Sequence, residues 1–363
     1  MAGLYIHIPF CRSLCIYCGF YSTTALEMRQ RYVDALCREM EERSCTDTVF
    51  TIYLGGGTPS QLTIPQLHQL FDHIYNINKV ADRPEVTIEV NPDDVTDDFV
   101  AALSQLPVNR VSMGIQTFSN QRLRFLHRRH TAEQAFEAVD RLRKAGFSNI
   151  SVDLMYGFPG ETLNDWQYDI TSVLVLGVEH LSAYCLTIEE ETPLHRMNVA
   201  PADEETERAM YYTLIDRLAA AGYEHYEISN FARPGHRSRH NSGYWTNVPY
   251  IGLGAAAHSY DGHRRQWNVS DINTYIRGFE NGTPEVGFEF IDDATRYNER
   301  VMLSLRTADG ITLDDLPTDD CTYLLAAAQP HLDSGLLSLN GSCLRLTRPA
   351  LFVSDMIISD LMR

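Results

Sequence analysis

The feature that most constrains the fold is the alternation of short β-rich runs with longer amphipathic stretches from residue 5 to about residue 230. Such alternation is typical of repeated βα units, in which helices pack against a parallel sheet. Six runs are predicted as strands, at residues 5–8, 51–54, 86–90, 110–114, 149–154 and 180–186. Eight units would close a full barrel, so six units predict an α/β fold with an incomplete (β/α)6 barrel.

The stretches between these runs carry the signals of helices. One has an apolar face formed at four-residue spacing by Met28, Tyr32, Leu36 and Met40. A second begins with the capping-box pair Thr131 and Gln134 and ends before Gly146. A third opens at Asp203 with an acidic first turn and ends before Gly222. The sequence therefore predicts helices that cover the sheet with their apolar sides.

Past about residue 285 the rhythm changes to short helices, a late β-like run at 343–347 and a final apolar helix at about 351–362. We therefore expect two domains, a barrel with an extension at 1–285 and a small winged-helix-like α+β domain at 286–363. Many winged helices bind DNA. Residues 291–363, however, hold six Arg, no Lys and eleven Asp or Glu, and the whole chain has a net charge of −18. Because such a surface repels phosphate backbones, nucleic acid is not expected as a partner.

The sequence also suggests where the protein works. Its first residues lack the basic stretch and cleavage site of a signal peptide, and no apolar run approaches the roughly 18 residues that a membrane span needs. The eight cysteines are unevenly placed, with three of them inside eight residues near the N-terminus. This spacing does not indicate a disulfide framework, so we expect a protein of the reducing cytoplasm.

Three cysteines follow the first predicted strand in the pattern C-x3-C-x2-C, at Cys11, Cys15 and Cys18. Thiolates at this spacing can converge on one soft metal centre. A structural zinc site would need a fourth Cys or His nearby, and the candidates Cys37 and Cys45 have no paired spacing. A [4Fe-4S] cluster held by three cysteines leaves one iron free for a substrate or cofactor. The pattern therefore favours such a cluster.

The stretch YIHIPFCRSLCIYCGF (5–20) resembles the signature of radical S-adenosylmethionine (SAM) proteins. This resemblance implies that SAM chelates the free iron and is cleaved to a 5′-deoxyadenosyl radical. The chain as a whole resembles the coproporphyrinogen oxidase group of that superfamily, which contains the anaerobic oxidase HemN and the haem chaperone HemW. The match rests on the motifs GGGTPS (55–60), EVNP (89–92), GIQT (114–117) and GFPGET (157–162), each at the end of a predicted strand.

The resemblance implies two sets of SAM contacts. Contacts to the cluster-bound SAM are implied for Tyr5, Tyr17, Gly56 and Glu89. A second SAM pocket, as in HemN, is implied for Gly57, Thr58, Gln116, Arg128 and Asp153. From the residues alone, the glycines let backbone approach a ligand closely, whereas Glu89 and Asp153 are also suited to cap helices and Arg128 to be a solvated charge.

Two features separate the branches of this group. Phe20 stands where the oxidase is expected to show a fourth cysteine, and only ten residues precede Cys11, although the resemblance implies an N-terminal extension in the oxidase. HNSGYW (240–245) matches the HNxxYW motif of the HemW branch, whose histidine is implicated in haem binding. A neutral imidazole is an axial ligand of haem iron, so His240 is the predicted ligand. Its alternative is a hydrogen-bonded structural residue.

The resemblance thus implies a haem chaperone that binds haem, SAM and a [4Fe-4S] cluster and delivers haem to acceptor haemoproteins. The expected acceptors are membrane-associated respiratory enzymes, which would bring the protein to the membrane surface. The alternative is an oxygen-independent coproporphyrinogen III oxidase, or another radical SAM enzyme acting on a porphyrin. No catalytic residue is assigned, and SAM cleavage and homodimer formation stay open. His258, in the small-residue run GLGAAAHSY (252–260), is not predicted as a ligand.

Overall fold

Six parallel strands form the centre of a large sheet in the computed structural model, which describes residues 2–45, 47–190 and 192–363. Neighbouring strands pair in parallel in chain order. They are β1 (Ala2–Ile8), β2 (Val49–Gly56), β3 (Val80–Val90), β4 (Arg110–Gln116), β5 (Ile150–Tyr156) and β6 (His180–Cys185). Each predicted strand is confirmed. The carboxyl ends of all six therefore lie at one edge of the sheet.

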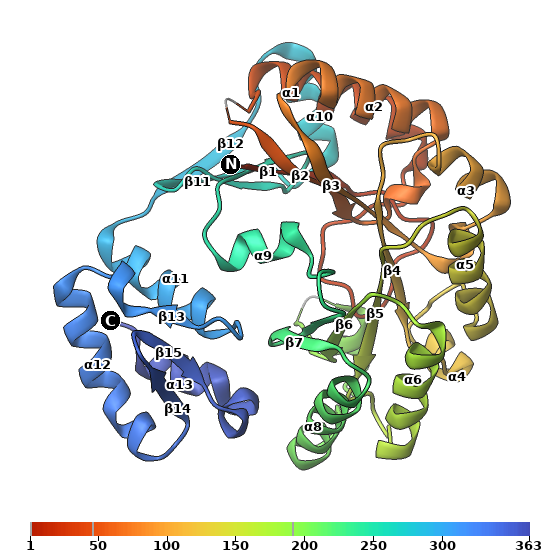
Figure 1. The fold of residues 1–363 in the computed structure, drawn as a ribbon. Coiled ribbons are helices and arrows are strands. Elements are labelled where there is room, and N and C mark those ends of the chain that lie inside the picture. Colours follow the sequence, from red (N-terminus) through yellow and green to blue (C-terminus); the bar gives the residue numbers. More distant parts are fainter. Residues whose placement is uncertain (1, 46, 191) are drawn as a thin grey trace.

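Helices cover the outer face of the curved sheet (Figure 1). They are α1 (Arg29–Glu42), α2 (Ile64–Ile77), α3 (Asp97–Leu103), α4 (Asn120–Phe125), α5 (Ala132–Lys144), α6 (Leu163–Leu176) and α8 (Glu204–Ala220). The short α7 (Pro193–Arg196) precedes α8. Leu36 and Val139 belong to the same buried core as Leu4 and Ile52 of the sheet. The capping box of Thr131 and Gln134 is present at the start of α5, which confirms that helix start.

Short strands extend both edges of the sheet, giving twelve strands within the described residues. Beside β1, the sheet continues through β9 (Tyr250–Leu253), β10 (His258–Tyr260), β11 (Arg264–Asn268) and β12 (Val286–Phe290). Beside β6, β8 (Asn230–Ala232) and β7 (Glu224–Glu227) pair antiparallel. The sheet curls around α9 (Arg239–Trp245), while α10 (Ile272–Asn281) lies by α1 on the outside (Figure 1). The incomplete barrel is thus confirmed, with edge strands that were not predicted.

The C-terminal part forms a small unit with its own core (Figure 1). It contains α11 (Asp293–Leu305), α12 (Thr318–Asp333) and α13 (Ser354–Asp360), with a sheet of β13 (Ile311–Thr312), β14 (Leu337–Asn340) and β15 (Cys343–Leu346). The separate small α+β domain is confirmed, although β12 belongs to the large sheet, and the division between residues 285 and 286 stays a prediction. Within the described ranges, no helix has the length and apolar character needed to cross a membrane.

Candidate functional site

A cavity of about 480 Å³ opens where the parallel strands end. This is the edge at which parallel α/β folds carry their chemistry. Its wall includes most of the predicted site residues, namely Cys11, Cys15, Tyr17, Cys18, Gly56, Gly57, Thr58, Glu89, Gln116, Arg128 and Asp153. Tyr5 and His240 are not on this wall. The structure therefore unites most of the predicted residues and separates two from them.

The three cysteines of the loop after β1 are partly buried, free thiols. Burial, reinforced by the neighbouring thiols, raises the pKa of Cys18 to about 11. Burial also raises the pKa of Cys11, although a hydrogen bond to Thr58 opposes this. Thiols with such pKa values stay protonated near neutrality until a metal displaces their protons. In the chain alone the thiols Cys11 and Cys18 are therefore expected to be neutral.

The arrangement of the cysteines fits a [4Fe-4S] cluster. In the described part of the chain, no group of three or more His, Cys, Asp or Glu side chains is placed to hold a single metal ion. Cys11, Cys15 and Cys18 instead share the wall of one cavity, and a cluster of four irons takes thiolates spread around it. Arg128 donates a hydrogen bond to Cys15 Sγ at 3.6 Å and supplies positive charge beside the sulfurs. The donor set and the cationic neighbour thus suit that group.

Glu89 presents its carboxylate at the floor of the cavity. Tyr53 donates to its Oε1 at 2.7 Å and the Gly56 N–H donates to its Oε2 at 3.1 Å. Burial raises the pKa of Glu89 to about 7 and that of Asp153 to about 6. Both residues lie within strands, β3 and β5, so neither of them caps a helix. Both buried carboxyls thus have pKa values near neutral pH, and in the ionised form they are suited to accept hydrogen bonds from a cationic ligand.

The backbone at two strand ends adopts the left-handed region. Gly56 has φ of 105°, and a Cβ there would come within 2.4 Å of the His7 ring, so only glycine fits without a shift. Gln116 has φ of 71° at the end of β4, an uncommon conformation for a residue with a side chain. Such strain is concentrated at ligand sites. Both residues line the cavity, as the resemblance implies.

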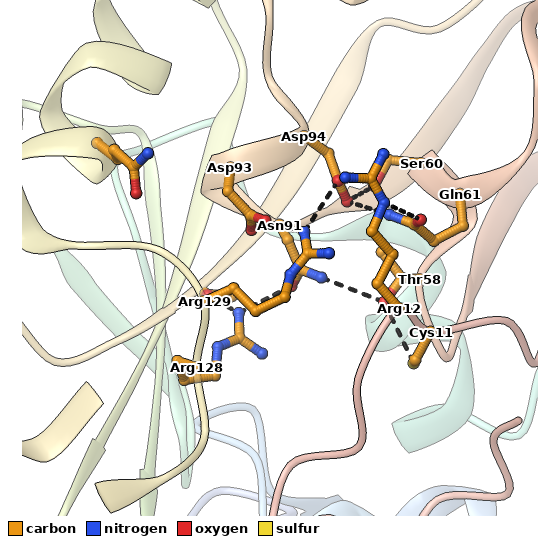
Figure 2. A network of polar contacts seen from close by, with 12 residues as sticks. Cys11, Arg12, Thr58, Ser60, Gln61, Asn91, Asp93, Asp94, Arg128 and Arg129 are labelled. Atoms are coloured by element: carbon orange, nitrogen blue, oxygen red, sulfur yellow. Dashed lines mark hydrogen bonds and ion pairs between the residues drawn. The ribbon is translucent and has the colours of Figure 1, made fainter. Parts of the chain in front are cut away.

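Arg128 is held in place on the cavity wall by two acceptors, one from a side chain and one from the backbone. Its guanidinium donates to Asn91 Oδ1 at 2.8 Å and to the Gly114 carbonyl (Figure 2). Asn91 in turn donates to Thr58 Oγ1 at 3.2 Å, and that hydroxyl lies 3.3 Å from Cys11 Sγ. Arg128 is therefore not a solvated surface charge but part of a chain of polar contacts that ends at the cysteines.

A second polar network lies beside it and was not predicted from the sequence. Arg129 forms ion pairs with Asp93 and Asp94, and Asp94 accepts hydrogen bonds from Ser60 and Gln61 (Figure 2). Arg12 donates to Gln61 Oε1 at 3.0 Å. The network ties the cysteine loop to the segments after β2 and β3. Its only sequence signal was its proximity to the GGGTPS and EVNP motifs.

Other residues on the cavity wall escaped prediction as well. Tyr184 and Cys185 belong to the end of β6, the one predicted strand end for which no motif was recognised. At the mouth, Leu14 is 51% exposed and Phe20 is 73% exposed. The position expected to carry a fourth cysteine in the oxidase thus presents an exposed apolar ring.

Tyr5 lies inside the curve of the sheet and not on the cavity wall. Its hydroxyl is 3.0 Å from His7 Nδ1, and its ring centroid is 6.2 Å from that of Tyr53. Because Tyr53 donates a hydrogen bond to Glu89 on the cavity wall, the ring of Tyr53 lies between Tyr5 and the cavity. A direct contact of Tyr5 with SAM therefore stays a prediction.

His240 is buried in α9, which lies within the curve of the sheet (Figure 1). The residue is 4% exposed, and its ring stacks on that of Tyr53 with centroids 5.0 Å apart. Nδ1 lies 2.8 Å from Thr51 Oγ1 and Nε2 lies 2.9 Å from the Tyr244 hydroxyl. Burial, with a smaller contribution from Arg110, lowers the pKa of His240 to about 3. The imidazole is therefore neutral, with both ring nitrogens hydrogen-bonded.

This setting bears on the predicted haem ligand. A ring nitrogen must be free to bind iron, so ligation by His240 would require Thr51 or Tyr244 to give up its hydrogen bond. The backbone N–H of His240 is also fixed, because it donates to Glu85 Oε1 at 2.9 Å. This geometry is the one expected of a hydrogen-bonded structural residue, which was the alternative to a haem ligand. Ligation of haem by His240 stays a prediction.

Comparison with known proteins supplies further findings. The model of the radical SAM superfamily matches residues 5–172, and that of the HemN C-terminal domain matches residues 291–353. The heme chaperone HemW of Bacillus subtilis is 37% identical over 325 residues, which cover 86% of this chain and 85% of that one. HemW of Lactococcus lactis is 35% identical over 315 residues, covering 85% and 83%. HemW of Mycobacterium tuberculosis is 35% identical over 373 residues, covering 99% and 94%.

A solved structure shows the same fold. Coproporphyrinogen III oxidase (HemN) from Escherichia coli, a radical SAM enzyme, superimposes with a TM-score of 0.88 over 99% of this chain and 90% of that one. The two sequences are 22% identical in this comparison. Both the barrel and the small C-terminal unit therefore have a counterpart in a known structure.

Proposed function

The chain belongs to the HemW family within the radical SAM superfamily, and on this premise we propose that it is a haem chaperone, which binds haem and delivers it to acceptor haemoproteins. The observation that carries the proposal is the mouth of the cavity. Three free cysteines meet there, and exposed Phe20 takes the position of a fourth thiol. The chain thus has the parts for a cluster and for SAM, but lacks a residue expected for decarboxylation of a porphyrin precursor.

Each part of the cavity has a proposed task. Cys11, Cys15 and Cys18 would hold the [4Fe-4S] cluster, which when bound supplies an electron to SAM. Arg128 balances the charge of the thiolates, since it donates to Cys15. Gly56 must be glycine because a side chain there would meet His7, and its N–H orients Glu89 in the cavity. These tasks concern binding and positioning, and they do not require turnover of SAM.

Glu89 would accept a hydrogen bond from the cluster-bound SAM, and Gln116, Arg128 and Asp153 would line a second SAM pocket. The shared support for these roles is their common cavity wall. Ionised Glu89 is already oriented by Tyr53 and the Gly56 N–H, so it can accept from an ammonium group without reorganising.

We further propose that the acceptors are membrane-associated respiratory enzymes and that the protein works in the cytoplasm, at the membrane surface. Haem carried by a chaperone must be passed on to a protein with a vacant haem site. The HemW relatives are named heme chaperones, which supports delivery of haem to a protein, whereas the identity of the acceptors is the finer part of this proposal.

The competing function is oxygen-independent oxidation of coproporphyrinogen III. The close superposition on HemN, with a TM-score of 0.88, favours it to the extent that the same barrel and C-terminal unit are present. Against it stands Phe20, which cannot ligate metal or transfer a proton. The two functions differ in what they do to a porphyrin, one carrying it unchanged and the other shortening its propionate side chains.

An anaerobic titration of the cluster-reconstituted protein with haem, followed by absorption spectroscopy, tests the proposal. We expect saturable binding at one haem per chain, transfer of that haem to an apo-haemoprotein, and no decarboxylation when coproporphyrinogen and SAM are supplied under reducing conditions. The protein without reconstituted cluster is the control that separates haem binding from cluster absorption. Decarboxylated product, or the absence of saturable haem binding, would contradict the chaperone function.

A further inference from the structure

An exposed histidine lies on a different part of the molecule from buried His240. His258 begins β10, in the group of edge strands beside β1. Its ring makes no hydrogen bond within the described residues, and its one ring contact is with Trp267, at 5.9 Å between centroids and an interplanar angle of 28°. Both nitrogens of this imidazole are therefore available to a ligand.

His258 and Trp267 belong to a row that crosses three strands. His258 is opposite Trp267 of β11, and Trp267 is opposite Gly287 of β12. A Cβ at Gly287 would lie 2.3 Å from Trp267 Nε1, so the indole occupies the space above this glycine. The absence of a side chain at Gly287 thus makes room for the indole, which lies beside the imidazole of His258.

This row is on the face of the sheet that is turned toward α9. His258 and Tyr260 point to the same side because side chains alternate along a strand, and Tyr260 is opposite Tyr250. Tyr250 contacts Tyr244 of α9 at 4.7 Å between ring centroids. Tyr244 is also the residue that contacts His240, at 5.1 Å. β11 and β12 lie on the side of α9 away from β4 to β6 (Figure 1).

The other exposed histidines lack such surroundings. In the parts of the chain that the structure describes, the exposed histidines are His127, His195, His258 and His263. Of these, His258 alone has an aromatic ring in contact with its own. An imidazole binds haem iron through a ring nitrogen and stands roughly perpendicular to the porphyrin, so a nearly parallel indole beside it would meet the same face of the porphyrin with its apolar edge.

We propose that His258 is an axial ligand of the haem that this chain carries, on the face formed with Trp267. The inference rests on the proposed haem-binding function and goes beyond the HNxxYW motif. It assigns to His240 the task of fixing α9 against the sheet through Thr51 and Glu85.

The charges around His258 suit a ligand imidazole. Burial of part of the ring and then Arg265 lower the pKa of His258, while Glu289 opposes this. The neutral form, which is the form that ligates iron, therefore predominates at neutral pH. Arg265 is itself paired with Glu289 and Glu299, so these three side chains together carry a formal charge of −1, which favours the positive charge of haem iron beside them.

The test compares three variants of the full, cluster-reconstituted chain, His258→Ala, His240→Ala and the matched control His263→Ala. Ferric and ferrous haem spectra report whether an imidazole ligates the iron, and a titration gives the affinity. We expect His258→Ala to weaken haem binding by about 10- to 100-fold, as damage to a metal site does, and to lose the spectrum of imidazole ligation. His263→Ala should match the unaltered chain.

A second variant distinguishes ligation from a structural effect. In His258→Gly, free imidazole added to the solution should restore the lost spectrum, because it can occupy the vacated position. His240→Ala, measured at a temperature where circular dichroism shows it folded, should keep the spectrum. Unchanged haem spectra in His258→Ala, or their loss in folded His240→Ala, would overturn the inference while leaving the chaperone function intact. Absence of haem binding by the unaltered chain would instead overturn the function and the inference together.

Discussion

The two ends of the barrel interior differ in how their polar groups are satisfied. At the carboxyl ends of the strands, free thiols and the carboxyls of Glu89 and Asp153 face a cavity. At the other end, His240 uses both ring nitrogens, and His180 likewise lies 2.7 Å from both Ser151 Oγ and the Tyr226 hydroxyl. A region that receives ligands exposes its polar groups to a cavity, even where some of them are hydrogen-bonded, whereas a region that holds the fold together buries them against one another.

The comparison teaches that residue type alone does not identify a ligand site. Imidazoles and thiols are both good metal ligands, but in this chain the three thiols line a cavity, whereas His240 is buried with both ring nitrogens hydrogen-bonded. Tyr53 joins the two ends, since it stacks on His240 and donates to Glu89. A substitution of His240 is therefore expected to shift the ring of Tyr53 and, through it, the carboxylate of Glu89.

The largest effect is expected from the cysteines. Replacing Cys11, Cys15 and Cys18 together by Ala should abolish iron and sulfide binding and, with it, tight SAM binding. Among the described residues, the one further thiol on the cavity wall is Cys185, and a single thiolate does not hold a cluster that takes three. Iron and sulfide analysis with absorption spectroscopy of the reconstituted protein measures this. Cys321→Ala, in α12 of the C-terminal unit, is the control and should bind a full cluster. Retention of iron by the triple variant would show that the cavity is not the cluster site.

The next effect concerns the end of the barrel around His240, where the polar side chains are hydrogen-bonded to one another. His240→Ala removes two hydrogen-bond partners and the ring that stacks on Tyr53, so it should lower the free energy of unfolding by about 3 kcal/mol. His258→Ala, at an exposed ring, should change it by no more than about 0.5 kcal/mol. Urea unfolding of the cluster-free chain measures both. Equal stability losses in the two variants would erase the proposed difference between these histidines.

The centre of the fold could be predicted because its signal is local. β1 to β6 are runs of β-branched and apolar residues, and they are separated by capped helices such as α5. The edge strands β9 to β12 carry no such signal. Gly252 interrupts β9 and Gly287 interrupts β12, and the pairing of these strands depends on partners that folding supplies. Short strands of this kind are recognisable only once β1 offers an edge to pair with.

The site follows the same division. Cys11, Gly56 and Glu89 could be placed because each follows or ends a predicted strand, and parallel strands end at one edge. The pairing of Arg129 with Asp93 and Asp94 could not, since it joins segments 36 and 35 residues apart by geometry alone. The burial of His240 could not be predicted either, since its hydrogen-bond partner Thr51 lies 189 residues away in the sequence.

The third prediction concerns pH, which changes the contributions of Glu89 and His240 to stability in opposite directions. Burial holds the pKa of Glu89 at about 7, above its usual value of 4.5, so its contribution to stability is present below about pH 4.5 and is lost as pH rises through 7. His240 behaves oppositely, because its pKa is lowered to about 3, and its contribution is lost as pH falls below 6.5. At pH 8, Glu89→Gln should therefore stabilise the cluster-free chain, by on the order of 3 kcal/mol, since each pKa unit corresponds to about 1.4 kcal/mol.

Urea unfolding at pH 5 and pH 8 checks this prediction. The gain from Glu89→Gln should shrink toward pH 5, where the carboxyl of the unaltered chain is protonated in the folded state. The control is Glu137→Gln, at an exposed position of α5, which should show little change at either pH. A gain that is the same at both pH values would mean that the substitution of Glu89 acts by packing and not by removing a buried charge.

The smallest effect is expected at Thr51, the hydroxyl that meets His240 Nδ1. Thr51→Val keeps the shape of this buried side chain but leaves the ring nitrogen without its partner, so the free energy of unfolding should fall by about 1 kcal/mol. Thr246→Val, at the exposed end of α9, should have less effect. The haem titration of the same variant sharpens the comparison further. If His240 ligates the iron and Thr51 orients it, Thr51→Val should lower both the haem affinity and the free energy of unfolding. If His258 ligates the iron, only the free energy of unfolding should fall, because Thr51 then contributes to the structure around His240 and not to the haem site.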